Sequence, residues 1–311
     1  MLKRFVKYLI GQNYFLSRWW WKRGLEQSLK ASSGDPIIDY QMGKVGSSTI
    51  RVSLTERGLN QAFYHVHFLN PVRVAEIERQ RRQYFGTDKQ ALLTRPWTYQ
   101  FLYEQIQKKD RHWKIITLVR EPVARNISTF FENLEVSKKP DGDLYAIKSD
   151  YYGIDIEVSP DNVEPLISLF FERLQHDRPL RYFDDEIKTV FGLDVYTDKF
   201  PTQKGYRIYP ADHADLLLIR LENLNDCAAD AFRAFMDIDD FSLVQTNVGS
   251  EKIYAPLYSA FKQSIRLPES YLDRMYNAKY TRYFFTDEEI RGFRRNWKTE
   301  QMATTQSKNV E

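Results

Sequence analysis

Cysteine is nearly absent from the chain: Cys227 is the single cysteine among 311 residues. One cysteine excludes an intramolecular disulfide framework and a zinc site built from several thiolates. The five histidines show no metal-ligand spacing, so the sequence predicts no metal site. Sparse use of cysteine is typical of proteins in a reducing compartment, and we expect this protein to be cytoplasmic.

An excess of charge of one sign is also missing, because 45 basic residues face 42 acidic ones and the formal net charge is +3. This balance argues against a surface that binds nucleic acid throughout, so no nucleic-acid partner is predicted. Any binding of anions has to come from local clusters. A chain with 42% hydrophobic and 28% charged residues has an ordinary globular composition.

The sequence also lacks a long apolar run. A membrane-spanning helix needs about 20 consecutive apolar residues. Four basic residues interrupt the best candidate, residues 2–21, which also lacks the small-residue cleavage site of a signal peptide. Residues 18–23 read Arg-Trp-Trp-Trp-Lys-Arg. Two interpretations of these tryptophans stay open: peripheral contact with a membrane surface, or packing of a helix on the domain.

The order of the predicted elements indicates an α/β fold. Four short apolar segments predict strands, at residues 37–41, 63–68, 114–119 and 216–220. Helical patterns between them predict a parallel sheet flanked by helices, with extra helices at the C-terminal end. The polar, aromatic stretch 137–162 is expected to be a long loop. We divide the chain into a basic aromatic segment (1–34), one α/β domain (35–298) and a polar tail (299–311).

One strand-to-helix junction has the composition of a phosphate or sulfate cradle. Residues 43–49 read Gly-Lys-Val-Gly-Ser-Ser-Thr. The glycines let the backbone curl, the helix start offers unpaired N–H groups, and Lys44 adds a full positive charge. A nucleotide-hydrolysing P-loop has its lysine after the last glycine, whereas Lys44 precedes Gly46. No predicted strand ends in the aspartate that would hold Mg²⁺ in such enzymes.

Two motifs resemble those of sulfotransferases that use 3′-phosphoadenosine 5′-phosphosulfate (PAPS). Residues 41–48, Gln-Met-Gly-Lys-Val-Gly-Ser-Ser, resemble the 5′-phosphosulfate loop, although many members have proline before the lysine. Residues 118–128 resemble the 3′-phosphate motif, with Arg120 ending a strand and Ser128 eight residues later. The closest resemblance is to bacterial carbohydrate-sulfotransferase-like proteins, also described as capsular polysaccharide synthesis proteins. The stretches 217–224 and 277–280 resemble the same group.

This resemblance implies a P-loop-NTPase-like sheet and transfer of a sulfonate from PAPS to a hydroxyl of a carbohydrate or polysaccharide. The product would be 3′-phosphoadenosine 5′-phosphate, and no metal is demanded. Lys252, in the loop 247–254, would close over the nucleotide. The residues expected to bind the nucleotide are Lys44, Val45, Gly46, Ser47, Ser48, Thr49, Arg120, Ser128 and Lys252. Two alternatives stay open: a P-loop NTPase or kinase, and a non-catalytic protein of this fold that binds an anionic glycan or a membrane.

Two histidines are candidates for the general base that the acceptor hydroxyl needs. His65 and His67 lie two residues apart on one predicted strand, so both side chains point to the same face. A histidine titrates near neutral pH, which suits this role. His67 lies nearer the carboxyl end of the strand, so we predict His67 as the base, His65 as its assistant and Lys44 as the third catalytic residue. The reverse assignment stays open, as do two core histidines with a carboxylate such as Glu104 as the base.

Overall fold

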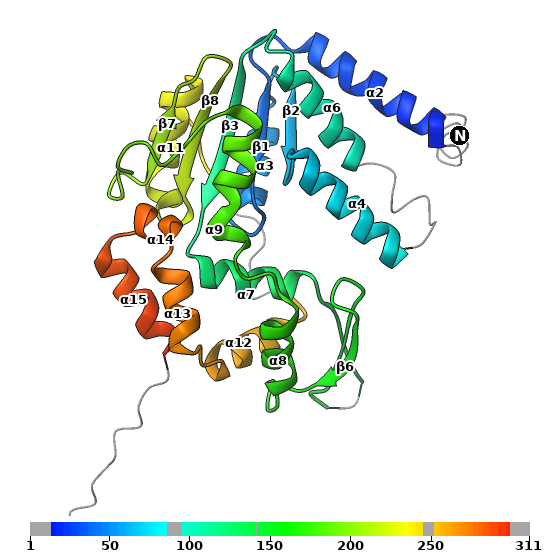
Figure 1. Ribbon diagram of the computed structural model, residues 1–311, viewed down its shortest axis with the longest axis vertical. Coiled ribbons are helices and arrows are strands. Elements are labelled where there is room, and N and C mark those ends of the chain that lie inside the picture. The colour runs from blue at the N-terminus through cyan, green and yellow to red at the C-terminus, as the bar shows by residue number, and fades with distance from the viewer. Residues whose placement is uncertain (1–13, 86–94, 141, 245–251, 299–311) are drawn as a thin grey trace, which may run out of the picture.

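A five-stranded sheet with the order β2-β1-β3-β8-β7 forms the centre of the computed structural model, which describes residues 14–85, 95–140, 142–244 and 252–298 (Figure 1). Strands β1, β2, β3 and β8 are parallel, and β7 pairs antiparallel with β8 at the edge. The strands are β1 (Ile37–Tyr40), β2 (Phe63–Val66), β3 (Trp113–Val119), β7 (Tyr206–Tyr209) and β8 (Ala214–Arg220). The predicted helix-flanked parallel sheet is therefore confirmed for four strands, and β7 is an addition.

Helices flank this sheet and continue beyond it toward the C-terminus (Figure 1). Those before the last sheet strand are α2 (Tyr14–Ala31), α3 (Ser47–Glu56), α4 (Pro71–Phe85), α6 (Arg95–Gln107), α7 (Pro122–Glu132), α8 (Glu164–Arg173), α9 (Arg178–Tyr182), the π-helical turn η1 (Phe183–Lys188) and α10 (Thr189–Phe191). Those after it are the 3₁₀ turn η2 (Leu221–Asn223), α11 (Leu224–Met236), α12 (Ala255–Ser264), α13 (Glu269–Tyr276), α14 (Lys279–Phe284) and α15 (Asp287–Trp297).

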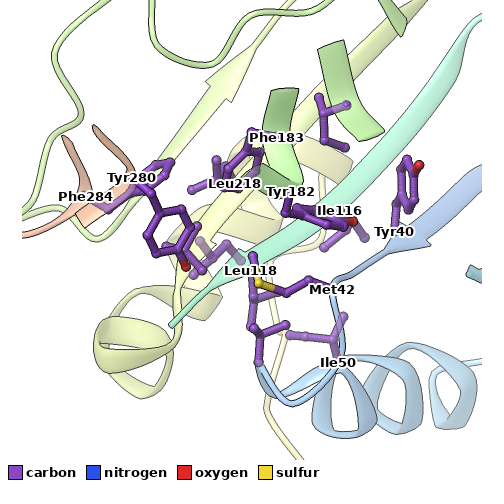
Figure 2. Packing of buried hydrophobic residues seen from close by; sticks show 14 of the residues in the cluster. Tyr40, Met42, Ile50, Ile116, Leu118, Tyr182, Phe183, Leu218, Tyr280 and Phe284 are labelled. Atoms are coloured by element: carbon purple, nitrogen blue, oxygen red, sulfur yellow. The ribbon is translucent and has the colours of Figure 1, made fainter. Parts of the chain in front are cut away.

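The central strands of the sheet are apolar and buried. In β3 and β8 the last five residues of each strand are all buried, as expected for strands that are covered on both faces. Figure 2 shows how side chains from several elements meet there, with Ile116 and Leu118 of β3 beside Leu218 of β8. Aromatic rings from the C-terminal half, Tyr280 and Phe284, complete the same cluster. The C-terminal helices are thus part of the core that supports the sheet.

The segment expected to be a long loop, residues 137–162, instead contains most of a small antiparallel sheet. The sheet consists of β4 (Glu135–Lys138), β5 (Tyr145–Ser149) and β6 (Ile154–Val158), in the order β4-β5-β6. The loop prediction was wrong because polar residues alternate with apolar ones here, and Tyr145 and Ile147 of β5 are buried. Alternation of this kind is the pattern of a half-buried strand.

The N-terminal helix α2 packs against α6 through its C-terminal half, where Leu29 is buried (Figure 1). Its three tryptophans are exposed: Trp19 by 58%, Trp20 by 41% and Trp21 by 37%. The interpretation that these rings pack in the core is therefore wrong for the chain as described. No helix within the described residues has the length and apolar character to cross a bilayer.

The pairing register brings the ends of the parallel strands to one edge of the sheet. Tyr40 at the end of β1 lies opposite Val66 of β2, and Val119 of β3 lies opposite Arg220 of β8. Parallel α/β sheets bind ligands beyond the carboxyl ends of their strands. The loop of residues 43–49, the two histidines and Arg120 all follow or end these strands, at the edge from which α7 leaves (Figure 1).

Candidate functional site

The loop between β1 and α3 holds three residues in the left-handed region: Gly43 at φ 78°, Lys44 at φ 60° and Gly46 at φ 95°. The curl brings the backbone close to its neighbours, so a Cβ at Gly46 would lie 2.7 Å from Cδ1 of Leu221. Helix α3 then begins with the bond from Thr49 N–H to the Gly46 carbonyl, 3.1 Å long. The preceding N–H groups are those that helix starts offer to anions.

A cavity of about 550 Å³, which we call the loop cavity, opens beside this helix start. Its charged lining residues among those described are all basic: Lys44, Arg120 and Lys252. Hydroxyl groups and two tyrosines complete the wall, and the whole lining is Lys44, Gly46, Ser47, Ser48, Thr49, Arg120, Ser128, Leu221, Lys252, Tyr254, Ala255, Tyr258 and Ser259. Cations, hydroxyls and a helix N-terminus together suit a ligand with several negative charges.

Arg120 lines the loop cavity and also forms a hydrogen bond to the loop of residues 43–49. Its Nη1 donates to the carbonyl of Lys44 over 2.9 Å, which connects the end of β3 to the loop after β1. Its backbone N–H and C=O both bond the hydroxyl of Tyr280, at 3.1 and 2.9 Å. Within the described residues Arg120 forms no ion pair with Glu121 or Glu132. Burial raises the pKa of the Glu222 carboxylate, and the charge of Arg120 opposes that shift.

Glu132 lies between the two lysines of the site. Its Oε2 is 2.7 Å from Lys44 Nζ and 3.4 Å from Lys252 Nζ. Burial lowers the pKa of Lys44, and the bond to Glu132 opposes that shift. For Glu132, burial raises the pKa, but the bonds to the lysines outweigh it and the net pKa is lowered. The carboxylate holds both ammonium groups at the position where an anionic ligand would contact them.

A second cavity of about 540 Å³, the histidine cavity, lies on the other side of the loop. His65 and His67 both line it, together with Lys44, Ser47 and Ser48. The two imidazole rings meet edge to face with their centroids 4.7 Å apart. The predicted shared face of the two histidines is therefore confirmed. Because Lys44, Ser47 and Ser48 line both cavities, the two cavities adjoin at the loop.

Hydrogen bonds fix the tautomer of both rings. Nδ1 of His67 bonds the carbonyl of Gln41 over 2.7 Å, and a carbonyl accepts only, so Nδ1 carries the proton. Nδ1 of His65 bonds Oδ2 of the fully buried Asp39 over 2.6 Å. The neutral rings then carry their lone pairs on Nε2. His65 has the carboxylate partner, whereas His67 lies against the loop, 3.9 Å from the Cβ position of Gly43.

The structure brings together the predicted site residues, with two qualifications. Val45 is fully buried in the core and lines neither cavity. Lys252 lines the loop cavity, but residues 247–251 of the predicted closing loop lie outside the described part of the chain. Glu104 is exposed on α6 and lines neither cavity, whereas Glu132 lines the histidine cavity. The alternative that Glu104 is the base is therefore wrong.

Sequence reasoning missed several residues that the fold adds to the site. Asp39 sits in a strand of apolar neighbours, and a lone carboxylate there was a signal of a buried partner. Tyr254 and Tyr258 are four residues apart, which places both rings on one side of α12 facing the loop cavity. Glu132 follows Ser128 by one helical turn on α7 and reaches the same lysines.

The turn after Arg120 is held from the C-terminal half of the chain. Glu121 caps α7 by accepting from the N–H groups of Val123 (2.7 Å) and Ala124 (2.6 Å), and it also accepts from the hydroxyl of Tyr276. Its own N–H donates to the carboxylate of Glu222 over 2.7 Å. Burial raises the pKa of Glu121 to about 7. This network fixes the direction in which Arg120 leaves β3.

Metal ligands are not grouped in the part of the chain that the structure describes: no three His, Cys, Asp or Glu side chains there could hold an ion together. The anion-binding character of the site comes from its lysines, arginines and helix start.

A family model matches part of the chain. The model NKWYS, described as “Putative capsular polysaccharide synthesis protein”, matches residues 155–286. No curated protein and no solved structure matches the chain. The matched region supplies Lys252, Tyr254 and Tyr258 to the loop cavity and Tyr280 to the Arg120 turn. Over residues 155–286 the chain thus has the sequence pattern of a capsular polysaccharide synthesis family.

Proposed function

We propose that this protein is a sulfotransferase that moves a sulfonate from PAPS to a hydroxyl of a carbohydrate acceptor. One observation carries the proposal: at the loop of residues 43–49 a cavity lined by three cations adjoins a cavity lined by two histidines, and Lys44 lines both. Sulfuryl transfer needs this arrangement, because the anionic nucleotide and the hydroxyl nucleophile approach the sulfur from opposite sides.

The residues of the loop cavity fit the nucleotide. Arg120 and Ser128 would bind its 3′-phosphate, and the loop N–H groups with Ser47 to Thr49 would bind the 5′-phosphosulfate. The tyrosines at 254 and 258 offer ring faces near these groups. Lys252 would reach the phosphates once Glu132 releases it.

PAPS supplies an activated sulfonate, and the chain supplies charge stabilisation and a base. The acceptor oxygen forms a bond to sulfur while the bond from sulfur to the 5′-phosphate oxygen breaks, and that oxygen keeps the electron pair. Lys44 stabilises the charge that grows on it. Nε2 of His67 takes the proton of the acceptor hydroxyl, with His65 and Asp39 beside it. The product nucleotide is 3′-phosphoadenosine 5′-phosphate.

Two measurements test the proposal. In thermal-shift titrations, adenosine 3′,5′-bisphosphate should raise the unfolding temperature more than ATP with Mg²⁺; at 100 times its Kd, a ligand adds about 2.7 kcal/mol of apparent stability. Transfer of radiolabel from [³⁵S]PAPS should then be detected against a panel of glycans.

Matched variants separate the site from general charge effects. Arg120→Ala should abolish most of the shift, whereas Lys148→Ala removes an exposed charge on β5, outside both cavities, and should leave it unchanged. Stabilisation by ATP with Mg²⁺ alone would favour a P-loop NTPase or kinase and overturn the proposal. Binding of the bisphosphate without transfer to any acceptor would leave a non-catalytic protein of this fold.

A further inference from the structure

The histidine cavity carries a marked excess of positive charge. Its described lining includes a single carboxylate, Glu132, which already pairs with Lys44. The cations that face it are Lys44, Arg51, Arg73, Arg125 and Arg178. Neutral sugars need hydroxyl and amide partners rather than charge, so the mechanism of transfer to a hydroxyl does not account for this excess.

Three of these cations form no ion pair within the described part of the chain: Arg51, Arg125 and Arg178. Arg125 is 2% exposed, and its guanidinium bonds neutral acceptors, the carbonyl of Met42 at 2.8 Å and Oδ1 of Asn126 at 3.2 Å. Arg178 lies over the ring of Phe68, 4.4 Å from its centroid. A buried charge without a counter-charge is costly, and Arg125 is such a charge. With the half-buried Arg178 and the exposed Arg51 on the same wall, it indicates a ligand of opposite charge.

The arginines also destabilise one another's charge. Burial, followed by the charge of Arg178, lowers the pKa of Arg125 to about 9. Burial, followed by the charge of Arg73, lowers the pKa of Arg178 to about 10. An anion in the cavity would relieve this repulsion. The charge of Glu186 opposes the shift of Arg178 only in part, and the net pKa of Arg178 stays lowered.

The apolar part of the same wall suits sugar rings. Phe68 has a guanidinium near its ring from Arg178 and another from Arg73, at 5.7 Å. Tyr151 is 39% exposed and lines the cavity as well. The C–H face of a pyranose packs on such rings while its charged groups reach the arginines.

The cavity continues into a neighbouring space that would hold more of a chain. A cavity of about 710 Å³ shares part of its wall with the histidine cavity: Phe68, Arg73, Leu174, Gln175 and Arg178. Farther along, its cations are paired, Arg181 with Asp185 and Arg274 with Asp177. The unpaired positive charge is thus concentrated next to the histidines, at the reacting end of the groove.

We propose that the histidine cavity selects an anionic glycan, with a carboxylate, phosphate or sulfate group held by Arg51 and Arg178 beside the hydroxyl that His67 deprotonates. The buried Arg125 adds positive charge behind the cavity wall. The inference rests on the proposed function for the identity of the ligand as a carbohydrate. Its charge preference rests on the arginines alone and can be tested without PAPS.

The test measures binding of matched polymers by titration calorimetry. Neutral dextran is compared with carboxymethyl dextran and dextran sulfate, and hydroxyethyl cellulose with carboxymethyl cellulose, so that charge varies on two fixed backbones. Charged polymers should bind at least about tenfold more tightly than neutral ones at low ionic strength, and the difference should shrink with added salt. The carboxylate and sulfate arms identify which anion is preferred.

Variants locate the binding. Arg51→Gln, at an exposed arginine without an ion pair, should weaken binding of carboxymethyl dextran about two- to fivefold. Arg178→Gln should weaken it about tenfold or more, and Arg178→Lys should recover part of the loss. The matched control is Arg295→Gln, because Arg295 on α15 is exposed and lines neither cavity. Adenosine 3′,5′-bisphosphate should bind all of these variants as it binds the unmodified protein.

Three results would overturn the inference: equal affinity for charged and neutral polymers on both backbones, loss of binding in Arg295→Gln as large as in Arg51→Gln, or equally tight binding of oligo(dT) that depends on the same arginines. The last would identify an unselective polyanion groove. Failure of the bisphosphate to bind any variant would refute the sulfotransferase proposal instead, and would leave the charge preference standing.

Discussion

Lys44 combines a positive φ with a side chain shared between two cavities. The ammonium is 2.7 Å from Glu132, while the carbonyl of the same residue accepts from Arg120 over 2.9 Å. The side chain of Lys44 therefore contacts Glu132, whereas its backbone contacts Arg120. This separation makes Lys44 and Arg120 distinguishable in an experiment, although both are basic and line the same cavity.

Lys44→Ala and Arg120→Ala should fail in different ways. Lys44 is proposed to stabilise charge that develops during the reaction, so its loss should lower kcat about 10²- to 10³-fold with a smaller change in nucleotide Kd. Arg120 is proposed to bind a phosphate that does not react, so its loss should raise the Kd about 10- to 100-fold. Single-turnover kinetics and bisphosphate titration separate the two. Full turnover in Lys44→Ala would contradict the assignment of the loop.

Variants of the two histidines should differ in the rate of sulfuryl transfer and not in their affinity for the nucleotide. His67→Ala should lower the transfer rate about 10²- to 10⁴-fold and leave bisphosphate binding nearly unchanged, because the base acts in the chemical step. His65→Ala and Asp39→Asn should have similar, smaller effects, since Asp39 acts through His65.

The pH–rate profile decides between the two rings. Its acid limb should disappear in the variant that lacks the base. If it disappears in His65→Ala and persists in His67→Ala, the roles are exchanged. Full transfer rates in both variants, with lower thermal stability, would make the pair structural.

At the scale of elements, the turn from β1 to α3 depends on the left-handed conformation of Gly46. Gly46→Ala should lower stability by about 1–3 kcal/mol through backbone strain and should also weaken bisphosphate binding, since the new Cβ meets Leu221 and shifts the loop. Gly58→Ala is the control: φ is 70° there, but no atom lies within 4 Å of the new Cβ. Chemical denaturation and nucleotide titration should show strain in both variants and weaker binding in Gly46→Ala alone. Equal binding in both would argue against a role for the loop.

His176 joins α8 to α13 and gives the fold a dependence on pH. Nε2 bonds the carbonyl of Phe170 over 2.9 Å, and Nδ1 bonds the hydroxyl of Tyr271 over 2.8 Å. Burial lowers the pKa of His176 to about 4, against about 6.5 for an unfolded histidine. Between these values the unfolded state binds more protons, so stability falls as the pH is lowered from 6.5 to 4.

His176→Gln should reduce this dependence, because glutamine can donate to one partner and accept from the other without titrating. The histidine contributes up to about 3 kcal/mol of the acid-induced loss. Urea denaturation at pH 7 and pH 4.5 measures the difference. An unchanged loss in the variant would mean that the ring is protonated without penalty in the folded state.

At the scale of the whole molecule, the tryptophans of α2 form an exposed apolar patch next to basic residues. Replacing Trp19, Trp20 and Trp21 together by alanine should change the unfolding free energy by less than about 1 kcal/mol, since the rings are exposed. Sedimentation with vesicles that contain phosphatidylserine should decrease, because both the rings and the neighbouring bases favour an anionic interface.

Substitution is a cleaner test than deletion of residues 1–30, which would also remove the buried Leu29 and the carbonyl of Leu25 that accepts from Tyr64. Arg295→Gln is the control, because it removes an exposed charge on α15, away from α2. Unchanged sedimentation of the tryptophan variant would exclude a membrane contact through α2, and a large loss of stability would contradict the exposed position of the three rings.

The sequence by itself determined the parallel part of the sheet and the positions of the loop residues, because both depend on local patterns. Continuous apolar runs such as β3 are buried wherever they pair, and a glycine-rich turn before a helix exposes N–H groups whatever surrounds it. The region 137–162 escaped this reasoning because its strands are only four or five residues long, so each shows the alternation of polar and apolar residues over a short stretch. The edge strand β7 is also short, with four residues, two of them only partly buried.

Tertiary structure alone decided which residues share a cavity. Asp39 with His65, Glu132 with both lysines, and Arg178 with Arg125 come from different elements, and no spacing along the chain relates the last pair. The division of the loop between two cavities likewise depends on where α7, α9 and α12 pack against the sheet. Local sequence sets the backbone and the available chemistry, whereas burial and electrostatic partners are set by packing between segments that lie far apart in the chain.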